Sequence, residues 1–455
     1  MSSLKKVAVG IGIILAYAVL LFGIVYGIRT VYYDYKEGTS SSSQDAGHGN
    51  NEKNVVNADV NVVKTDDESE YSTNEQGKNE ELADKDEDVS NKDEDISDDT
   101  GLSDIDGSDD AVLEAGAEDE EGLIIIDKQA ANSNYASLSF AGDVSFANDY
   151  LPAQRYTNGG IDAAFSEEVQ NTMKEADIFL VNNEFCYSDR GTAQTAKGYC
   201  FRAKPETVSR LNEMGVDIVS IANNHAYDYG EEAFNDTIDT LNKAGMPYVG
   251  GGINIDDAVG HIVYFRINDM KIAYIAGTQI ERSLPTFTKE ATEDSAGVVR
   301  CFEPEVVCGM IKDAKEHSDF VIVYPHWGTE KDMSIQADQQ ALAYAFIDAG
   351  ADLIVGGHSH RLQGVEYYKN VSIFYSMSNF SFSSRVTDSC ILNVQVDKDG
   401  IRQSKYIPCM ENAGTTIQCE EGDSNYTRII STLNKISANA EIDDAGVVRQ
   451  KEVED

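Results

Sequence analysis

The chain is short of basic residues. Its 455 residues include 36 Lys and Arg against 79 Asp and Glu, which gives a formal net charge of −43 at pH 7. Proteins that bind nucleic acids place clustered Lys and Arg against the phosphates, and the sequence has no such basic patch. The composition therefore argues against a nucleic-acid partner.

The seven cysteines include no pair at the spacing of a zinc ligand set. None of them forms a Cys-x-x-Cys pair, so a structural zinc cluster is not expected. The odd number leaves at least one thiol unpaired within a monomer. Outside the cell, Cys186 with Cys200 or Cys409 with Cys419 could form a disulfide, although spacing alone establishes neither pair.

Signatures of two common enzyme classes are missing as well. The sequence has no Gly-x-Ser-x-Gly elbow and no P-loop. Their absence argues against hydrolases built on that serine elbow and against P-loop kinases. Any catalysis must therefore come from another set of polar side chains.

Charge is absent from residues 7–28, which follow Lys5 and Lys6. At ~1.5 Å per residue this segment is about 33 Å long, enough to cross a bilayer. It lacks a signal-peptide cleavage site and a lipobox-like cysteine, so we expect residues 1–36 to be an uncleaved signal anchor. The alternative, a buried core helix, would show a polar stripe. The acidic region that follows favours a single-pass cell-membrane protein with its C-terminal domain extracytoplasmic.

Residues 37–125 are rich in Asp, Glu, Ser, Asn and Gly. Between Gly38 and Glu121 there are 28 Asp and Glu but 5 Lys and Arg, so this stretch carries −23 of the net charge. Such a segment cannot bury enough apolar surface to offset its ordering entropy, and we expect a disordered, extended acidic linker. A tether that holds a domain clear of a cell surface and a plain solvated insert fit this composition equally well.

Five short apolar runs in the remaining chain stop at polar residues that can bind a metal or move a proton. Such runs are typical of strands buried on both faces. If the five strands share a sheet and a direction, the polar residues converge beyond their carboxyl ends. The runs are residues 137–140 before Asp143, 178–181 before Glu184, 218–221 before Asn224 and His225, 321–324 before His326, and 353–355 before His358 and His360.

Segments with helical spacing of apolar residues alternate with these runs. This alternation predicts an α/β layered domain over residues 126–440, followed by an acidic tail at 441–455. After residue 371 apolar runs follow one another without helices, which predicts more antiparallel strands there. The predicted helices are residues 161–176, 205–214, 231–244, 303–315, 334–349 and a short closing helix at 427–436.

His358 and His360 are the strongest candidate metal ligands. In an extended conformation, residues two apart point to the same face, so both imidazoles could reach one metal or two neighbouring ones. A lone histidine is more often a core residue, but two at this spacing after Gly356 and Gly357 favour ligands. Carboxylate, amide and imidazole groups together suit a divalent transition metal. The other candidates for the same site are Asp143, Glu184, Asn224, His225 and His326, while His48, His261 and His317 are assigned no role.

Chemical arguments support these residues as members of the site. The amide of Asn224 could bind metal without adding charge, although asparagines also favour plain turns. His225 beside it could stay unbound and act as a general acid. A carboxylate such as Glu184 can bridge two cations and screen their repulsion. Trp327 and Glu330 are weaker candidates, for a pocket wall and for a partner of His326.

Five further motifs lie in order along the chain: residues 197–206 (KGYCFRAKPE), 222–230 (ANNHAYDYG), 326–330 (HWGTE), 362–364 (LQG) and 375–380 (YSMSNF). Together they resemble the bacterial capsule-synthesis CapA family, the poly-γ-glutamate synthesis group. The resemblance covers roughly residues 135–437. It implies the calcineurin-like metallophosphatase fold, a four-layer α/β/β/α sandwich, in membrane-attached proteins that make, export or anchor an anionic polymer.

The resemblance also implies roles for single residues. Glu184 takes the bridging carboxylate position and His225 that of the unligated catalytic histidine. Asp143, Asn224, His326, His358 and His360 take the remaining metal-ligand positions. The implied cofactor is one or two divalent ions, of Mn, Fe, Zn or Mg.

Two departures from the family pattern bear on the metal site. Metallophosphatases generally have a histidine two residues after the first aspartate, where this chain has Ser145. One of two metal sites is thus short of a ligand. The late family motif Gly-His-His-Pro-His is replaced by residues 356–360 (GGHSH), which are closer to the phosphatase Gly-His-x-His form.

Two functional hypotheses follow. The first is a metal-dependent hydrolase or transferase acting on a phosphoester, ester or amide in capsule or poly-γ-glutamate biosynthesis. The second is a non-catalytic scaffold subunit of a polymer synthesis or export complex, which Ser145 supports. Both predict the same partners: the membrane, an anionic polymer such as poly-γ-glutamate or a cell-envelope precursor, and membrane synthase or export subunits.

Overall fold

The computed structural model describes residues 117–118, 122–281 and 287–452. The predicted signal anchor at residues 1–36, its span at about 7–28 and most of the linker at 37–125 lie outside these ranges. Within them, no helix combines the length and hydropathy that a membrane crossing needs.

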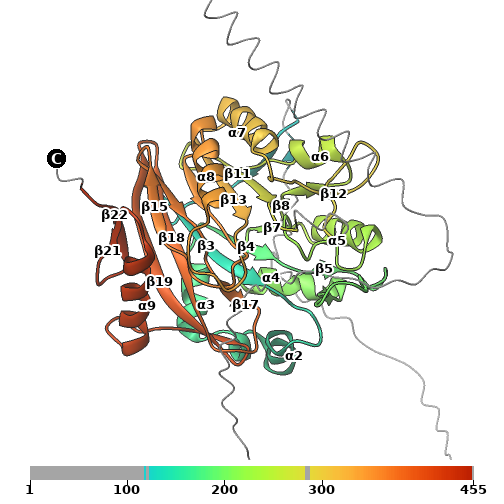
Figure 1. Ribbon diagram of the computed structural model, residues 1–455, viewed down its shortest axis with the longest axis horizontal. Helices are drawn as coiled ribbons and strands as arrows, with labels where there is room; N and C mark the ends of the chain where they lie inside the picture. The colour runs from blue at the N-terminus through green and yellow to red at the C-terminus, as the bar shows by residue number, and fades with distance from the viewer. Residues whose placement is uncertain (1–116, 119–121, 282–286, 453–455) are drawn as a thin grey trace, which may run out of the picture. The chain divides into compact units, whose positions relative to one another are not determined.

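Two large sheets form the framework of the domain (Figure 1). The eight-stranded sheet has the order β1 (Ala117–Glu118), β2 (Ile124–Asp127), β10 (Val263–Ile267), β11 (Met270–Thr278), β13 (Phe320–His326), β14 (Leu353–Val355), β16 (Val371–Phe374) and β15 (Val365–Tyr368). The ten-stranded sheet has the order β21 (Ala440–Ile442), β22 (Val447–Gln450), β19 (Gly400–Asn412), β18 (Thr387–Asp397), β3 (Ala136–Val144), β4 (Ile178–Asn183), β7 (Ile218–Ser220) and β8 (Tyr248–Val249), with β17 (Asn379–Ser381) on β3 and β20 (Thr415–Gln418) on β19.

Both sheets are mixed. β11, β13, β14 and β16 run parallel to one another, and so do β3, β4, β7 and β8. The predicted change to antiparallel strands late in the chain is confirmed by the pairing of β18 with β19 and of β22 with β19 and β21. Two small sheets pair β5 (Cys186–Tyr187) with β6 (Arg202–Ala203) and β9 (Gly251–Gly252) with β12 (Gly297–Val298).

Most helices cover the outer faces of the large sheets. The helices of the described residues are α2 (Leu151–Ala164), α3 (Glu167–Lys174), η1 (Pro205–Val208), α4 (Ser209–Glu213), α5 (Glu231–Lys243), α6 (Ile255–Gly260), α7 (Glu305–His317), α8 (Ala337–Ala349) and α9 (Ser424–Ile436). The last of them, α9, instead contributes to the apolar cluster between the sheets. One apolar cluster joins α2 to α5 with the ten-stranded sheet, and another joins α6 to α8 with the eight-stranded sheet. Figure 1 shows α7 and α8 beside β11 and β13.

A third apolar cluster fills the space between the two sheets. Alternate residues of one strand enter different clusters because successive side chains point to opposite faces. In β11, Ile272 and Tyr274 enter the cluster between the sheets, while Ala273 and Ile275 face the helices. The layers are therefore helix, sheet, sheet and helix, and the predicted mixed α/β class is confirmed.

Local capping explains where helices begin and end. The helix predicted at residues 161–176 is instead two helices, α2 and α3, separated by Phe165 in an extended conformation. Ser166 caps α3 by accepting a hydrogen bond from the Val169 amide, which begins a new helix at this point. At the end of α8, Gly350 adopts a φ of 122°, where its two donated hydrogen bonds close the last turn.

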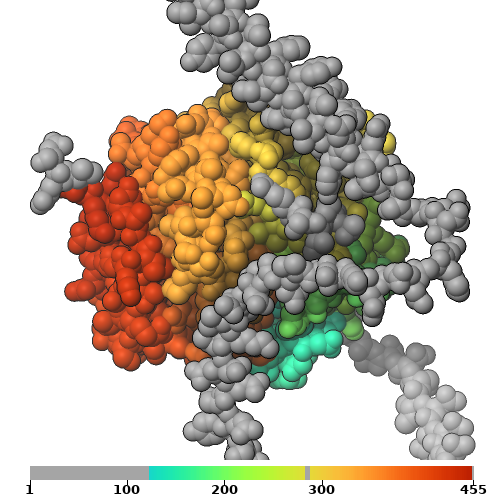
Figure 2. Space-filling model, viewed as in Figure 1, coloured from blue at the N-terminus to red at the C-terminus, as the bar shows by residue number. Residues whose placement is uncertain are grey.

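The C-terminal segment closes one edge of the domain. Residues 440–450, which include most of the predicted acidic tail, form β21 and β22, and the apolar Ile442 and Val448 of these strands are buried. The side chain of Asn439 accepts a hydrogen bond from the Tyr367 amide at 2.7 Å and so links the two sheets. Figure 2 shows this red segment packed against the preceding orange one.

Candidate metal centre

The polar residues that follow the apolar runs come from both sheets. β3, β4 and β7 belong to the ten-stranded sheet, whereas β13 and β14 belong to the eight-stranded sheet. The condition of one shared sheet is therefore not met, because an apolar run does not reveal which of two facing sheets a strand joins. The side chains still gather at one end of the sheet interface, where Asp143 and Glu184 face His326, His358 and His360.

Two groups of candidate ligands share one carboxylate. Glu184, His326 and His358 form the first group, and Asp143, Glu184 and His360 form the second. Within each group, one ligand atom of every residue lies within 4.8 Å of the others. Glu184 thus occupies the position of a bridging carboxylate between two possible ion positions. We refer to these as the first and the second ligand group.

Asn224 and His225 extend the first group. The Asn224 Oδ1 atom lies 2.8 Å from Nε2 of His326. The same Nε2 atom lies 3.0 Å from Nδ1 of His358. The Nε2 atom of His225 lies 3.9 Å from Oε1 of Glu184. The structure therefore brings all seven predicted site residues together.

One oxygen of Glu184 shows that these side chains fit a cation. Its Oε1 atom is buried and has no hydrogen-bond partner among the described residues. It lies 3.9 Å from Nε2 of each of three histidines, His225, His326 and His360. A buried polar atom without a partner costs about 1–3 kcal/mol, and a divalent ion among these lone pairs would satisfy it.

The electrostatics of the first group lead to the same conclusion. Burial raises the pKa of Glu184 well above its ordinary value, and the Asp143 carboxylate raises it further. Burial lowers the pKa of His326 to about 3 and that of His358 well below its ordinary value. Both imidazoles therefore stay neutral at pH 7 and keep a lone pair available for a metal ion.

The second group is arranged around a short contact. Nδ1 of His360 lies 3.0 Å from Oδ2 of Asp143. Burial alone would raise the pKa of Asp143, but the hydrogen bond and the charge of His360 bring it below the ordinary value. Asp143 is therefore ionised at neutral pH and supplies negative charge to a bound cation.

A hydrogen-bonded dyad holds His225 in place. Nδ1 of His225 lies 2.6 Å from Oδ2 of Asp228, and the Phe201 amide donates to the same oxygen at 2.6 Å. Lys197 donates to the other carboxylate oxygen at 2.8 Å. The Phe201 ring lies 4.2 Å from the imidazole. Residues 197 and 201 of the KGYCFRAKPE motif thus fix the ring so that Nε2 faces Glu184.

Asp228 and Asn182 were not among the predicted site residues. The Asn182 Nδ2 atom donates to Asp143 at 2.8 Å and to Glu184 at 3.0 Å, so it holds both carboxylates. A signal for Asn182 was present, since it lies two residues before Glu184 at the end of the same strand. Asp228 lies within the motif at residues 222–230 but ends no apolar run.

The loop after β14 does not have the extended conformation that the sequence predicts around its two histidines. His358 and His360 have φ angles of 93° and 52°, so the segment is not extended and the rings enter different ligand groups. Such left-handed conformations cost energy in residues with a Cβ and persist where the surroundings enforce them. A Cβ on Gly357 would lie 3.1 Å from Oδ1 of Asp143, so this position brings the loop backbone close to the site.

Trp327 and Glu330 do not play equivalent roles. Trp327 is fully buried among the helices outside the eight-stranded sheet, and its Nε1 donates to the Tyr375 carbonyl at 2.8 Å. It is therefore a packing residue rather than a pocket wall. Glu330 lines a cavity of about 320 Å³ together with His358, so this cavity opens beside the first ligand group.

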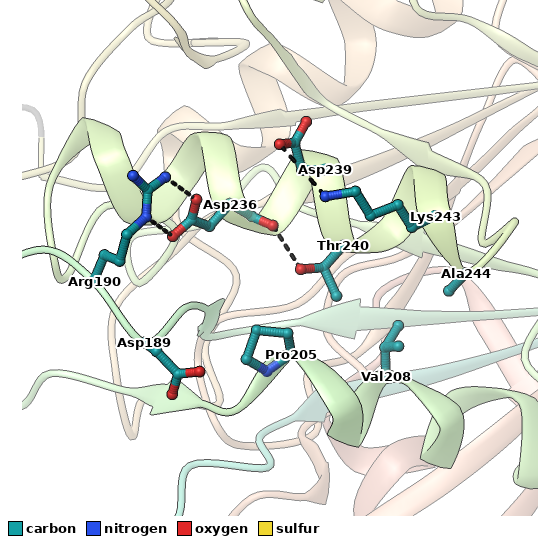
Figure 3. Close-up of a pocket in the computed structure, with 9 residues that line it drawn as sticks. All are labelled: Asp189, Arg190, Pro205, Val208, Asp236, Asp239, Thr240, Lys243 and Ala244. Carbon is teal, nitrogen blue, oxygen red and sulfur yellow. Dashed lines mark hydrogen bonds and ion pairs between the residues drawn. The ribbon is translucent and has the colours of Figure 1, made fainter.

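A second pocket lies apart from the predicted site residues (Figure 3). It has a volume of about 490 Å³ and lies against α5. Its charged groups pair with one another: Arg190 Nε donates to Asp236 at 3.1 Å, and Lys243 lies 3.9 Å from Asp239. This pocket offers no convergent set of unpaired groups comparable to the one around Glu184.

Comparisons with known proteins agree with the motif resemblance. Residues 137–384 match the family model described as bacterial capsule synthesis protein PGA_cap. The chain is similar to the PGA biosynthesis protein CapA of Bacillus subtilis (strain 168), with 32% identity over 308 residues that cover 66% of this chain and 78% of that protein. It is also similar to the capsule biosynthesis protein CapA of Bacillus anthracis, with 35% identity over 283 residues that cover 60% of this chain and 66% of that protein.

Among solved structures, the protein TT1561 of Thermus thermophilus aligns with a TM-score of 0.32 and 9% identity, over 57% of this chain and 98% of that chain. A likeness at this level supports no conclusion about the fold.

Proposed function

This chain belongs to the bacterial capsule synthesis protein PGA_cap family, and from that premise we propose that it acts in the biosynthesis of a capsule polymer such as poly-γ-glutamate. The names of the two Bacillus relatives, which concern capsule and PGA biosynthesis, support this assignment. The reaction we propose is metal-dependent hydrolysis or transfer at a phosphoester, ester or amide bond.

One observation carries the proposed chemistry. Two groups of candidate ligands share Glu184, and its buried Oε1 atom has no partner among the described residues. The first ligand group with Asn224, and the second ligand group, would hold one or two divalent ions of Mn, Fe, Zn or Mg. When bound, such an ion supplies Lewis-acid polarisation of a substrate oxygen and a water molecule of lowered pKa.

The protein's own contribution is to place a proton donor beside that centre. Burial lowers the pKa of His225, and the Asp228 carboxylate, which accepts the Nδ1 hydrogen, opposes part of that shift. When the ring is protonated, its Nε2 atom, 3.9 Å from Glu184, would donate a proton to the leaving group. Phe201 packs against the ring and excludes water from that side.

The same proposal covers the fold type and the location of the protein. The helix–sheet–sheet–helix order, with candidate ligands from both sheets, supports a metallophosphatase-type sandwich. The uncharged residues 7–28 and the acidic stretch after them support a single-pass anchor with the domain outside the cytoplasm. Membrane synthase or export subunits and an anionic polymer are the partners that we propose.

A non-catalytic scaffold is the second candidate, and one residue favours it. Ser145 replaces the usual histidine, and its Oγ accepts a hydrogen bond from the Ala147 amide at 3.3 Å. Its side chain is thus engaged with its own loop. A domain that has lost one ligand could hold metal weakly and serve only to assemble a polymer complex.

Metal analysis combined with a turnover screen separates these candidates. The full-length protein in detergent would be loaded with Mn, Fe, Zn or Mg and assayed on generic phosphodiesters, esters and γ-glutamyl amides. We expect turnover that disappears in His358→Ala and persists in the control His317→Ala, whose side chain lies on α7 away from the site. Bound metal without turnover on any substrate would favour the scaffold, and the absence of bound metal would refute the metal centre.

A further inference from the structure

The two ligand groups are not equally complete. In the first group, Glu184, His326 and His358 are joined by the amide oxygen of Asn224. Among the described residues, the second group has only Asp143, Glu184 and His360, because Ser145 carries no imidazole. Protein sites for divalent metals commonly use four or more donors. The second group is therefore one donor short.

Asn379 lies where the missing donor is needed. It belongs to β17, which runs parallel to β3 and pairs Asn379 with Asp143. Its side chain is buried, with 4% of the residue exposed. The Oδ1 atom lies 2.7 Å from Nδ1 of His360, the same nitrogen that lies 3.0 Å from Oδ2 of Asp143.

Hydrogen bonding explains only part of this contact. The Nδ1 atom of His360 carries at most one hydrogen, yet two oxygen acceptors, from Asp143 and Asn379, compete for it. Once Nδ1 gives up that hydrogen, all three atoms present lone pairs to one another. A cation among them would turn this competition into three favourable contacts.

The surroundings of Asn379 hold it in this position. The hydroxyl of Ser389 donates to the Asn379 carbonyl, and the preceding Ser378 has a left-handed φ of 64°. Glu411 accepts hydrogen bonds from the Phe382 and Ser383 amides, at 2.6 and 2.5 Å, and thereby fixes the chain just after β17. The conformational strain at Ser378 is the kind that persists where a functional side chain must be aimed.

We propose that Asn379 is a metal ligand of the second group and replaces the imidazole that is missing at Ser145. This inference rests on the metal centre of the proposed function. It also makes the two ion positions chemically different. The second would have three oxygen donors and one imidazole and would prefer Mn or Mg, whereas the first, with two imidazoles, would suit Zn or Fe better.

The stoichiometry of Mn²⁺ binding to the full-length protein tests the proposal without any substrate. Metal-free protein would be titrated with Mn²⁺, and free Mn²⁺ would be measured by electron paramagnetic resonance. We expect two ions per chain in the natural protein. In Asn379→Ala the affinity for the second ion should fall at least about tenfold while the first ion is unaffected. Asn379→Asp should keep both ions.

Controls separate a lost ligand from a lost fold. Asn393→Ala changes an asparagine of β18 whose side-chain amide donates hydrogen bonds to Ser137 and Ser139, away from the site. This variant should keep both ions. The double variant Ser145→His with Asn379→Ala should regain the second ion. Two ions bound with unchanged affinity in Asn379→Ala, or one ion in the natural protein, would overturn the inference. Failure to bind any ion would refute the proposed function itself.

Anomalous diffraction at the Mn edge decides whether Asn379 binds the ion itself or only positions His360. An Mn–Oδ1 distance of about 2.2 Å for Asn379 supports ligation. A distance beyond about 3 Å, with the His360 ring bound through Nε2, would overturn it, because Asn379 would then only orient that ring.

Discussion

Replacing Glu184 with glutamine should stabilise the metal-free protein and remove its response to metal. The Oε1 atom of Glu184 is buried without a partner among the described residues and lies close to the Asp143 carboxylate. Glutamine has the same shape, and its oxygen can keep the 3.0 Å hydrogen bond from Asn182. Its amide group would face the imidazole nitrogens as a donor, so the unsatisfied acceptor disappears.

The expected size of the effect follows from that one atom. An unsatisfied buried acceptor costs about 1–3 kcal/mol, so the free energy of unfolding of the metal-free variant should rise by about that amount. In a domain of this size, each kcal/mol moves Tm by about 2 °C, which predicts a rise of about 2–6 °C. With an ion at about a hundred times its Kd, the natural protein should gain about 2.7 kcal/mol and the variant nothing.

The difference between the two proteins should depend on pH. The pKa of Glu184 in the folded protein is raised, so its protonated form stabilises the fold at acid pH. That contribution is lost as the pH rises through the raised pKa. The stability advantage of Glu184→Gln should therefore be small in acid, where Glu184 is protonated, and should grow as the pH rises through the raised pKa of Glu184.

Thermal unfolding of the full-length protein, with chelator or with MnCl2 and at several pH values, measures the stability of the metal-free variant, the gain from metal and the pH dependence. The exposed Glu206, in η1, provides the control Glu206→Gln, which should leave both Tm values unchanged. The reasoning is refuted if metal-free Glu184→Gln is less stable than the natural protein and gains as much from metal.

Two further predictions concern the proton donor and the loop beside the site. His225→Ala should slow turnover by about 10²–10⁴-fold and leave metal stoichiometry unchanged, with His317→Ala as the control; equal rates would exclude His225 as the acid. Gly356→Ala should destabilise the protein by about 1–3 kcal/mol in urea unfolding, because the added Cβ would lie 2.5 Å from Nε1 of Trp327. In Gly309→Ala the Cβ meets no atom within 4 Å on α7, so an equal loss there would contradict the packing argument.

Parts of the fold and site could be predicted because they depend on local pattern. A buried parallel strand leaves a continuous apolar run, and a polar residue directly after it must lie at the carboxyl end of the strand. This reasoning locates Asp143, Glu184 and His326. The same pattern predicts alternating helices and strands, so the α/β class could be inferred without knowledge of the pairing.

Other features have no local signal. The apolar runs of β4 and β13 look alike, although the strands lie in different sheets, because both are covered on two faces. The positive φ angles of His358 and His360 occur in the loop that brings Gly357 close to Asp143, and this approach is a tertiary contact. Asn379 joins the site through the pairing of β17 with β3, across more than half of the domain sequence. Such long-range pairing cannot be inferred from residue spacing.

The distribution of the candidate ligands over two sheets would link metal binding to the packing of the domain. Asp143 and Glu184 belong to the ten-stranded sheet, while His326, His358 and His360 belong to the eight-stranded sheet or the loop after it. An ion held by both sets would connect the two sheets at the end where carboxylates and imidazoles replace the apolar cluster. Because ligands that bind only the folded state stabilise it, part of the binding free energy would be used to hold the sheets together. A scaffold that lost turnover would therefore still have a structural reason to keep these ligands, whereas only an enzyme needs the His225–Asp228 dyad beside them.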